Sequence, residues 1–444
     1  MQEQNNNNVQ VENENEITLS TTTIPSKLFR TNNFFWESYY NLSRINIDTQ
    51  GLKFPLKLNT RDPIVLTRDG LNEFRNDQAR PFCNKSETPL NKFLRFQEIS
   101  KQQQDIIYQF KSHTDQVKPC HRHEQMRRCL KFTAPNELIY QTKVSYELLD
   151  LTVNKTFPVL FLPEEHSGDY SRNPVTSFDI IKDKTHLYFY LCFGAMNGIV
   201  KLHKIHIKVI NRKIKMIKYN LIKQDNITHF QTQNVLINHI TFTNDIRGMF
   251  IASNAKEITY VDIQTLQLTC KYKYIVPINN FAFNEVYNIV GAVCDASPVV
   301  VFDARSTEVV HQLKGHNDHG FDIKFDNEFT MATGNQDISC ILWDVRKLGS
   351  DCAYKRLYGR IHPIGSVHFV KGGKIVYPEN EDYLHVYDMK RDKYQEFQFF
   401  GETSGCGVNP LNGDIYVGYY FLGSGGGLYA FENVEHNLRE VFVI

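Results

Sequence analysis

The stretch from Lys314 to Lys347 constrains the fold more than any other part of this 444-residue chain. It begins with a Gly-His dipeptide, ends with a Trp-Asp dipeptide and a short basic tail, and carries Thr333 and Asp337 ten and six residues before Trp343. This spacing predicts a small antiparallel sheet in which His316 meets Asp337 and the Thr333 hydroxyl meets the Trp343 indole. Each buried polar atom then has a partner, as a stable interior requires.

The end of this stretch recurs at a regular interval on both sides of Asp344. An aromatic or apolar residue followed by a polar one is found at intervals of 41 residues upstream, at Asp303 and Asp262, and of 44 residues downstream, at Asp388 and Glu432. A period of about 40–45 residues with Gly-His and Trp-Asp dipeptides is typical of WD40 propeller blades. A single blade leaves its faces unburied, so several must pack side by side.

Two further units extend the pattern upstream. Residues 193–204 match the template, but more residues separate them from the next unit than the period allows. We interpret these extra residues as an elongated hairpin around Asn211-Arg212. Residues 136–162 indicate another set of strands, giving seven units, a common closure number for a propeller. The sequence therefore predicts an all-β, seven-bladed WD40 β-propeller over residues 127–444. Its expected blades lie near 127–165, 174–222, 234–275, 277–312, 313–356, 361–398 and 403–443.

The N-terminal quarter has a different composition. Residues 1–22 are rich in Asn, Gln and Glu and are predicted to be disordered. Residues 23–126 are expected to form an extension packed on the propeller, with a helix that starts at Thr88-Pro89 and runs through Phe110. The aromatic cluster of this extension has two readings: it packs against the ring, or it docks a partner. The cluster consists of Phe34, Phe35, Trp36, Tyr39 and Tyr40.

Composition and short motifs narrow the function classes. The formal net charge of +1 argues against a dedicated polyanion binder, and nine scattered cysteines are typical of a reducing compartment. No secretory leader or membrane-spanning run is found, so we expect a cytoplasmic or nuclear protein with no membrane partner. No nucleophile elbow, HExxH or Walker sequence is present, which favours a non-enzymatic protein without a cofactor.

Two short motifs could suggest a ligand site, one for Zn²⁺ and one for phosphate, but neither is predicted to bind a ligand. The run Cys120-His121-Arg122-His123, with Cys129 and His113 nearby, has ligand types suited to Zn²⁺. It lacks a second Cys-x₂-Cys pair, so it predicts a polar linker and no metal site. The glycines of 423–427 precede a strand-like sequence where a phosphate cradle would need a helix, and therefore predict a turn.

The lysine-rich hairpin has two readings. Lys208, Arg212, Lys213 and Lys215 alternate with apolar residues, so their charges fall mostly on one face. They could contact RNA phosphates, although the hairpin lacks the aromatics that stack on bases. They could instead protect an outer edge strand from aggregation, and we favour this reading.

Polar and aromatic residues gather in the loops that the template places on one face of the propeller. An acidic arc with aromatics suits a cationic group, such as a peptide N-terminus or a Lys or Arg side chain. A solvated acidic rim is the competing interpretation. The residues are Asp295, Asp318, His319, Asn335, Gln336, Glu379, Glu381, Asp382, Glu402, Tyr420 and Phe421.

The last three predicted blades carry a more specific pattern. The sequences ATGNQDISCILWDVR, YPENEDYLHVYD and FFGETSGCGVNPLNGDIYVGYY resemble an intracellular WD40 family of fungi and plants. A looser similarity is to a propeller substrate receptor of a GID-type ubiquitin ligase, which captures proteins by their N-termini. The resemblance implies a scaffold that binds peptides or subunits on its loop face, and the looser similarity implies a substrate receptor within a ubiquitin ligase complex. An RNA-associated factor is the alternative.

Overall fold

The computed structural model describes residues 107–434, apart from short gaps at 120–127, 168–172, 184, 186–187, 211–212, 227–234, 266, 327–328, 350 and 422–424. The expected disordered tail, the aromatic cluster and nearly all of the expected helix lie outside these residues. The described chain consists almost entirely of antiparallel strands, with 3-10 turns at Glu164–His166 (η3) and Val345–Lys347 (η4). Within it, no helix has the length and apolar character needed to cross a membrane.

Five of the sheets in the described chain have four antiparallel strands each, paired in sequence order. They account for the first five predicted blades. Their strands are β2 (Leu130–Ala134), β3 (Glu137–Gln141), β4 (Ser145–Asp150) and β5 (Lys155–Phe161); β6 (Val175–Lys182), β7 (Tyr188–Ala195), β8 (Ile199–Ile210) and β9 (Lys213–Asn226); β10 (Ile237–Phe242), β11 (Gly248–Ser253), β12 (Glu257–Asp262) and β13 (Leu268–Lys273); β14 (Ile278–Asn284), β15 (Ile289–Cys294), β16 (Ala296–Asp303) and β17 (Val309–Leu313); and β18 (Gly320–Phe325), β19 (Thr330–Asn335), β20 (Ser339–Asp344) and β21 (Ala353–Tyr358).

A sixth sheet contains seven strands and covers the last two predicted blades. Its long strand β25 pairs with β24 through its first part and with β26 through its second part. The strands, in spatial order, are β1 (Tyr108–Thr114), β27 (Gly425–Asn433), β26 (Ile415–Phe421), β25 (Lys393–Val408), β24 (Glu381–Asp388), β23 (Lys374–Pro378) and β22 (His368–Val370).

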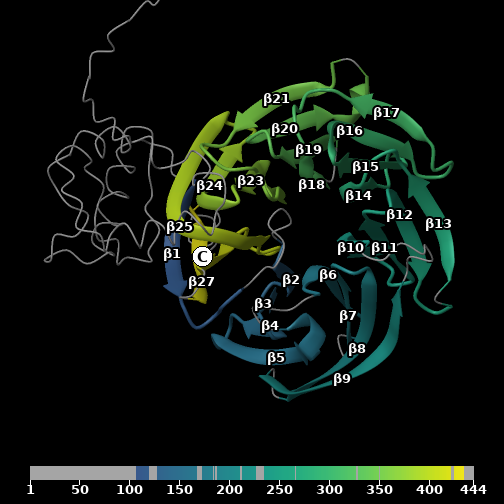
Figure 1. The fold of residues 1–444 in the computed structure, drawn as a ribbon. Helices are drawn as coiled ribbons and strands as arrows, with labels where there is room; N and C mark the ends of the chain where they lie inside the picture. Colours follow the sequence, from purple (N-terminus) through teal and green to yellow (C-terminus); the bar gives the residue numbers. More distant parts are fainter. Residues whose placement is uncertain are drawn as a thin grey trace, which may run out of the picture. The chain divides into compact units, whose positions relative to one another are not determined.

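The sheets follow one another around a ring (Figure 1). Apolar side chains from neighbouring sheets form a separate buried cluster at each junction, as with Ile323 and Trp343 beside Val299 and Val301. The first and last sheets also share such a cluster, in which Leu138 meets Leu428. The ring is therefore closed by apolar packing, as a β-propeller requires.

Strand β1 corrects two expectations about where the propeller begins. Residues 107–110 were expected to end a helix, but Tyr108–Thr114 pairs antiparallel with β27 and forms the edge of the seven-stranded sheet. The backbone N–H groups of Ile107 and Tyr108 also donate to Gln395 Oε1, at 3.1 and 2.8 Å. The propeller thus starts before residue 127, because β27 needs a strand to cover its edge and the segment that precedes the first sheet supplies it.

The elongated hairpin is confirmed. β8 and β9 have 12 and 14 residues and pair along their whole length. Two of its lysines are engaged inside the fold: Lys201 is buried and bonds Glu165 at 2.7 Å, and the Lys204 ammonium lies 4.2 Å from the centre of the Tyr188 ring. These two lysines therefore stabilise the hairpin base.

Candidate functional site

The sheet β18–β21 contains a continuous buried network between its entry loop and its central turn. Trp343 Nε1 donates to Thr333 Oγ1 at 2.8 Å, and Thr333 Oγ1 lies 2.8 Å from His316 Nε2. His316 Nδ1 lies 3.0 Å from a carboxylate oxygen of Asp337. Gly315 precedes the histidine because a Cβ there would come within 2.8 Å of the Trp343 ring.

The protonation of this network follows from burial. Burial lowers the pKa of His316 despite the neighbouring carboxylate, so the imidazole is neutral and its Nδ1–H donates to Asp337. Burial alone would raise the pKa of Asp337, but hydrogen bonds from His316 and Ser339 outweigh it and lower the pKa to about 2. The carboxylate therefore stays charged and fixes the loop to the turn.

The contact between His316 and Asp337 defines one end of the ring, which we call the loop end. It comprises the loops that lead into the first strand of each sheet and the turns between the second and third strands. The predicted partner-binding residues lie there, but the structure separates them into exposed and buried groups.

Three of the predicted residues form an exposed cluster on two neighbouring sheets. Asp295 lies in the β15–β16 turn, and Asp318 and His319 lie in the loop that enters β18. Their side chains are 34%, 42% and 42% exposed, and each carboxylate has an oxygen 3.9 Å from a ring nitrogen of His319. This cluster can accept a hydrogen bond or an ion pair from a partner.

Glu379 does not belong to an exposed arc, which corrects the prediction. Its side chain is fully buried and accepts the backbone N–H groups of Arg360, Ile361 and His362, the last two at 3.1 and 2.6 Å. The carboxylate thus caps the loop that enters β22. Glu379 faces inward because its carboxylate satisfies these three backbone donors of the neighbouring loop.

A second buried network, which the sequence analysis missed, continues from Glu379. His385 Nε2 lies 2.6 Å from Glu379, and His385 Nδ1 lies 3.4 Å from Glu396, which also binds Arg360 at 2.8 Å. Burial alone would lower the pKa of His385, but hydrogen bonds that the imidazole donates to the two glutamates raise it. The sequence did contain a signal for this network. His385 lies in the middle of YLHVYD, and a histidine inside a central strand must find polar partners.

The other predicted arc residues are also largely internal. Glu402 and Tyr420 are buried and opposite each other in the β25–β26 pairing. Asn335 is buried and donates to the Asp318 carbonyl at 2.8 Å, whereas Gln336 is half-buried. The side chain of Phe421 lies outside the described part of the chain. These residues therefore do not form a broad solvated arc.

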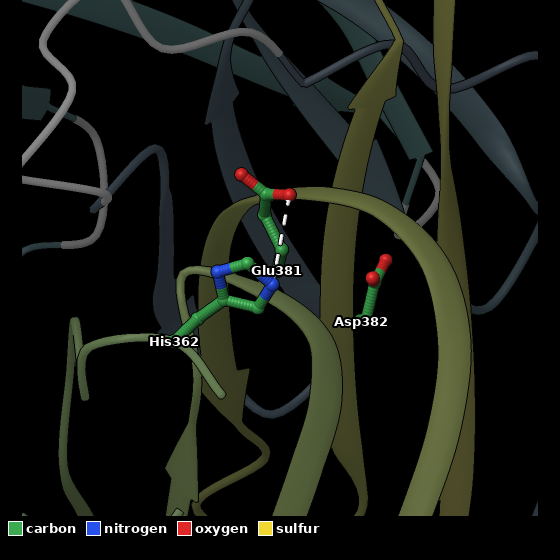
Figure 2. A group of neighbouring side chains, drawn as sticks. All are labelled: His362, Glu381 and Asp382. Carbon is green, nitrogen blue, oxygen red and sulfur yellow. Dashed lines mark ion pairs between the residues drawn. The ribbon is translucent and has the colours of Figure 1, made fainter. Parts of the chain in front are cut away.

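Glu381 and Asp382 form a cluster with His362 (Figure 2). One ligand atom from each lies within 4.8 Å of the others, and the types would suit a divalent cation. His362 Nε2 lies 3.9 Å from Glu381, and Asp382 accepts the Gly401 N–H at 3.0 Å. The sequence-based expectation of no metal site stays a prediction here.

Two other predicted sites fall partly outside the described residues. Arg212 and the side chains of Lys208, Lys213 and Lys215 lie outside them, as do Cys120, His121 and His123. Of the remaining possible zinc ligands, His113 lies 2.6 Å from the Tyr419 hydroxyl, and Cys129 is buried. The role of the hairpin lysines stays a prediction.

Comparison with known proteins supports the fold class. No family model and no curated protein matches the chain. A chain in the crystal structure of the mitotic checkpoint complex superposes with a TM-score of 0.56, at 10% sequence identity, over 80% of this chain and 99% of that one. That neighbour is a WD40-type propeller. The chain is therefore similar in fold to WD40 propellers.

Proposed function

We propose that this chain is a seven-bladed propeller that acts as a non-enzymatic scaffold for protein partners. The blade count rests on β25, whose two halves divide the seven-stranded sheet into β22–β24 with the first half and β26, β27 and β1 with the second. Each group then has four strands, like the other five sheets. A solved propeller of similar fold belongs to a multiprotein complex, which is in keeping with a scaffold role.

The observation that carries the docking site is the exposed cluster of Asp295, Asp318 and His319. Two carboxylates on adjacent sheets flank one imidazole, and the His316 network holds the loop that carries Asp318 and His319. A rigid, exposed acidic pair suits a cationic group, such as a peptide ammonium, lysine or arginine. We therefore propose that a partner docks at the loop end through a cationic group.

The test is a crosslinking pulldown from cells with a charge-reversed protein. Asp295→Lys with Asp318→Lys is expected to abolish recovery of the main crosslinked protein, while the thermal unfolding midpoint is retained. Glu285→Lys is the matched control, because Glu285 is exposed on the β14–β15 turn of the same sheet as Asp295, at the opposite end. Equal recovery with the double variant and the control would contradict the site.

The sequence motifs support a more specific proposal about the family of this chain and the complex in which it works. The motifs in residues 315–432 lead us to propose a fungal or plant WD40 family member, working in the cytoplasm or nucleus as a receptor of a GID-type ubiquitin ligase. Ligase subunits among the crosslinked proteins would support this assignment. If RNA were recovered and lost on changing Lys208, Lys213 and Lys215 to Glu, the RNA-associated alternative would replace it.

A further inference from the structure

A large cavity lies along the first strands inside the ring and reaches the turns at the end opposite the loop end. It has a volume of about 1010 Å³ and is lined by the first strands of several sheets and by turns such as 371–373. Six basic side chains and four carboxylates face it, an excess of two positive charges. They are Arg128, Lys131, Lys324, Arg346, Lys371 and Lys390, with Asp179, Asp322, Asp326 and Asp344.

Arg128 places a guanidinium across the cavity. It belongs to the segment that enters β2, yet it hydrogen-bonds the Phe321 carbonyl of β18 and lies 3.0 Å from His239 Nδ1 of β10. Its Nε is buried and has no hydrogen-bond partner among the described residues. A donor of a charged group is thus left for an acceptor that the described residues do not supply.

The carboxylates of the cavity are occupied by backbone groups. Asp322 accepts the N–H groups of Ile323 and Val367, at 3.0 and 2.8 Å, and so ties β18 to the segment that enters β22. Asp179 accepts the N–H groups of Ile180 and Phe242, at 2.9 and 2.8 Å. These aspartates therefore join neighbouring sheets. The backbone N–H groups that they accept compensate part of their negative charge.

Lys324 has an ion pair with a lining carboxylate but no hydrogen bond to it. Its ammonium lies 3.8 Å from Asp322, which is too long for a hydrogen bond, and it makes no hydrogen bond within the described part of the chain. Lys131, by contrast, contacts Asp179 directly. Arg128 lies 3.7 Å from the same Asp322 carboxylate, so Lys324 and Arg128 are two neighbouring cations that share one lining carboxylate and both line the cavity.

The two histidines that line the cavity, His239 and His368, add no positive charge to it. Burial, and next the charge of Arg128, lower the pKa of His239 well below its usual value. Burial lowers the pKa of His368 to about 4. Both imidazoles are neutral at physiological pH, as expected beside groups that are already cationic.

We propose that this cavity binds a phosphate-type dianion through Arg128 and Lys324. A tetrahedral oxyanion presents several acceptors at once, so it can use the Arg128 guanidinium and the Lys324 ammonium together. Its two charges match the excess of the lining. The bound group is inorganic phosphate or the phosphoryl group of a small metabolite.

The test is isothermal titration calorimetry of the full chain with pyrophosphate, inorganic phosphate, a phosphate monoester and acetate, at constant ionic strength. We expect binding of the phosphate compounds and none of acetate. Lys324→Gln should weaken binding by about 10–100-fold, the loss of one charge-assisted hydrogen bond, and Lys324→Arg should restore much of it. Tighter binding of the monoester than of inorganic phosphate would assign the site to a metabolite.

Lys314→Gln is the matched control, because Lys314 is exposed and lies in the loop that precedes β18, at the other end of that strand. It should leave binding unchanged, and circular dichroism would verify that all variants fold. Absence of binding heat for both inorganic phosphate and the phosphate monoester with the folded parent protein would overturn the proposal. So would equal weakening by Lys314→Gln and Lys324→Gln, which would assign the effect to overall charge.

Discussion

Replacing His316 with alanine should destabilise the propeller by breaking the network that holds the His316 loop to the Asp337 turn. The change removes the hydrogen bond to a charged carboxylate and the bond to Thr333. The first contributes about 1.5–3 kcal/mol and the second about 0.5–1.5 kcal/mol. Asp337 keeps its bonds from Ser339 and the Asn317 N–H, at 2.6 and 2.9 Å, so it is not left wholly unpaired. We expect a loss of about 2–4 kcal/mol.

The measurement is guanidinium unfolding followed by fluorescence and circular dichroism. Trp343 is one of only two tryptophans and is fully buried beside the network, so its emission reports on this sheet. A double-mutant cycle with Asp337→Ala isolates the contact, since residues in one network should give a coupling of about 0.5–3 kcal/mol. An unchanged midpoint, or strictly additive single effects, would refute this account of the network.

The same network predicts a pH dependence. The pKa of Asp337 is lowered to about 2 from an ordinary value of 3.8, so the folded state favours the carboxylate. A depressed pKa contributes stability that is present above pH 4 and is lost as the pH falls through 2, by about 2 kcal/mol in total. Asp337→Asn should remove this part of the acid sensitivity. An acid transition equal to that of the parent would contradict it.

Three further changes test other parts of the structure. Burial and the charges of Glu379 and Glu402 raise the pKa of Asp382 to about 8, so the folded state loses stability as pH rises from 4 through 8. Asp382→Asn should therefore be more stable than the parent at pH 8 and similar near pH 4, by thermal unfolding. A chain lacking residues 1–114 should aggregate in size-exclusion chromatography because it exposes the β27 edge, whereas a chain that begins at 105 should stay monomeric. Glu379→Lys should lower the unfolding midpoint strongly, because a buried ammonium would replace the acceptor of three backbone donors; a midpoint within error of the parent would count against the burial argument.

The sequence predicted the sheets because their ends carry chemical markers. Asp303 and Asp344 each end a third strand with a carboxylate that accepts backbone N–H groups of the following turn. Such a turn repeats with the sheet, so the period of the strands is visible in the polar residues. The His316 network was predictable for the same reason, since each of its members has a fixed place in the sheet.

Strand β1 could not be predicted in this way. Tyr108–Thr114 lacks the terminal marker, and its partner β27 lies more than 300 residues away in the sequence. Its alternation is weak, and the preceding apolar residues fit a helix pattern equally well. Only the open edge of β27 selects the strand, and that edge belongs to the folded sheet and is not visible in the local sequence.

The loop-end carboxylates show the other limit of the sequence. Position in a turn placed Glu379 and Asp318 at the same end of the ring, but it did not distinguish burial from exposure. Glu379 is buried because three N–H groups of the neighbouring loop point at it, and Asp318 is exposed because its loop supplies no such donors to its side chain beyond His319. The difference depends on contacts between loops from different sheets, which a linear pattern does not contain.

The loop end and the cavity should act as independent sites. Asp318 and Lys324 are six residues apart along the line of β18, which corresponds to about 20 Å in an extended strand. That distance exceeds the screening length of about 8 Å at physiological salt, so charges at one end should change binding at the other very little. Combining Lys324→Gln with Asp295→Lys and Asp318→Lys should therefore give the sum of the separate effects on pyrophosphate affinity and partner recovery. Loss of the protein partner on Lys324→Gln alone would contradict this separation and would place partner and anion in one coupled site.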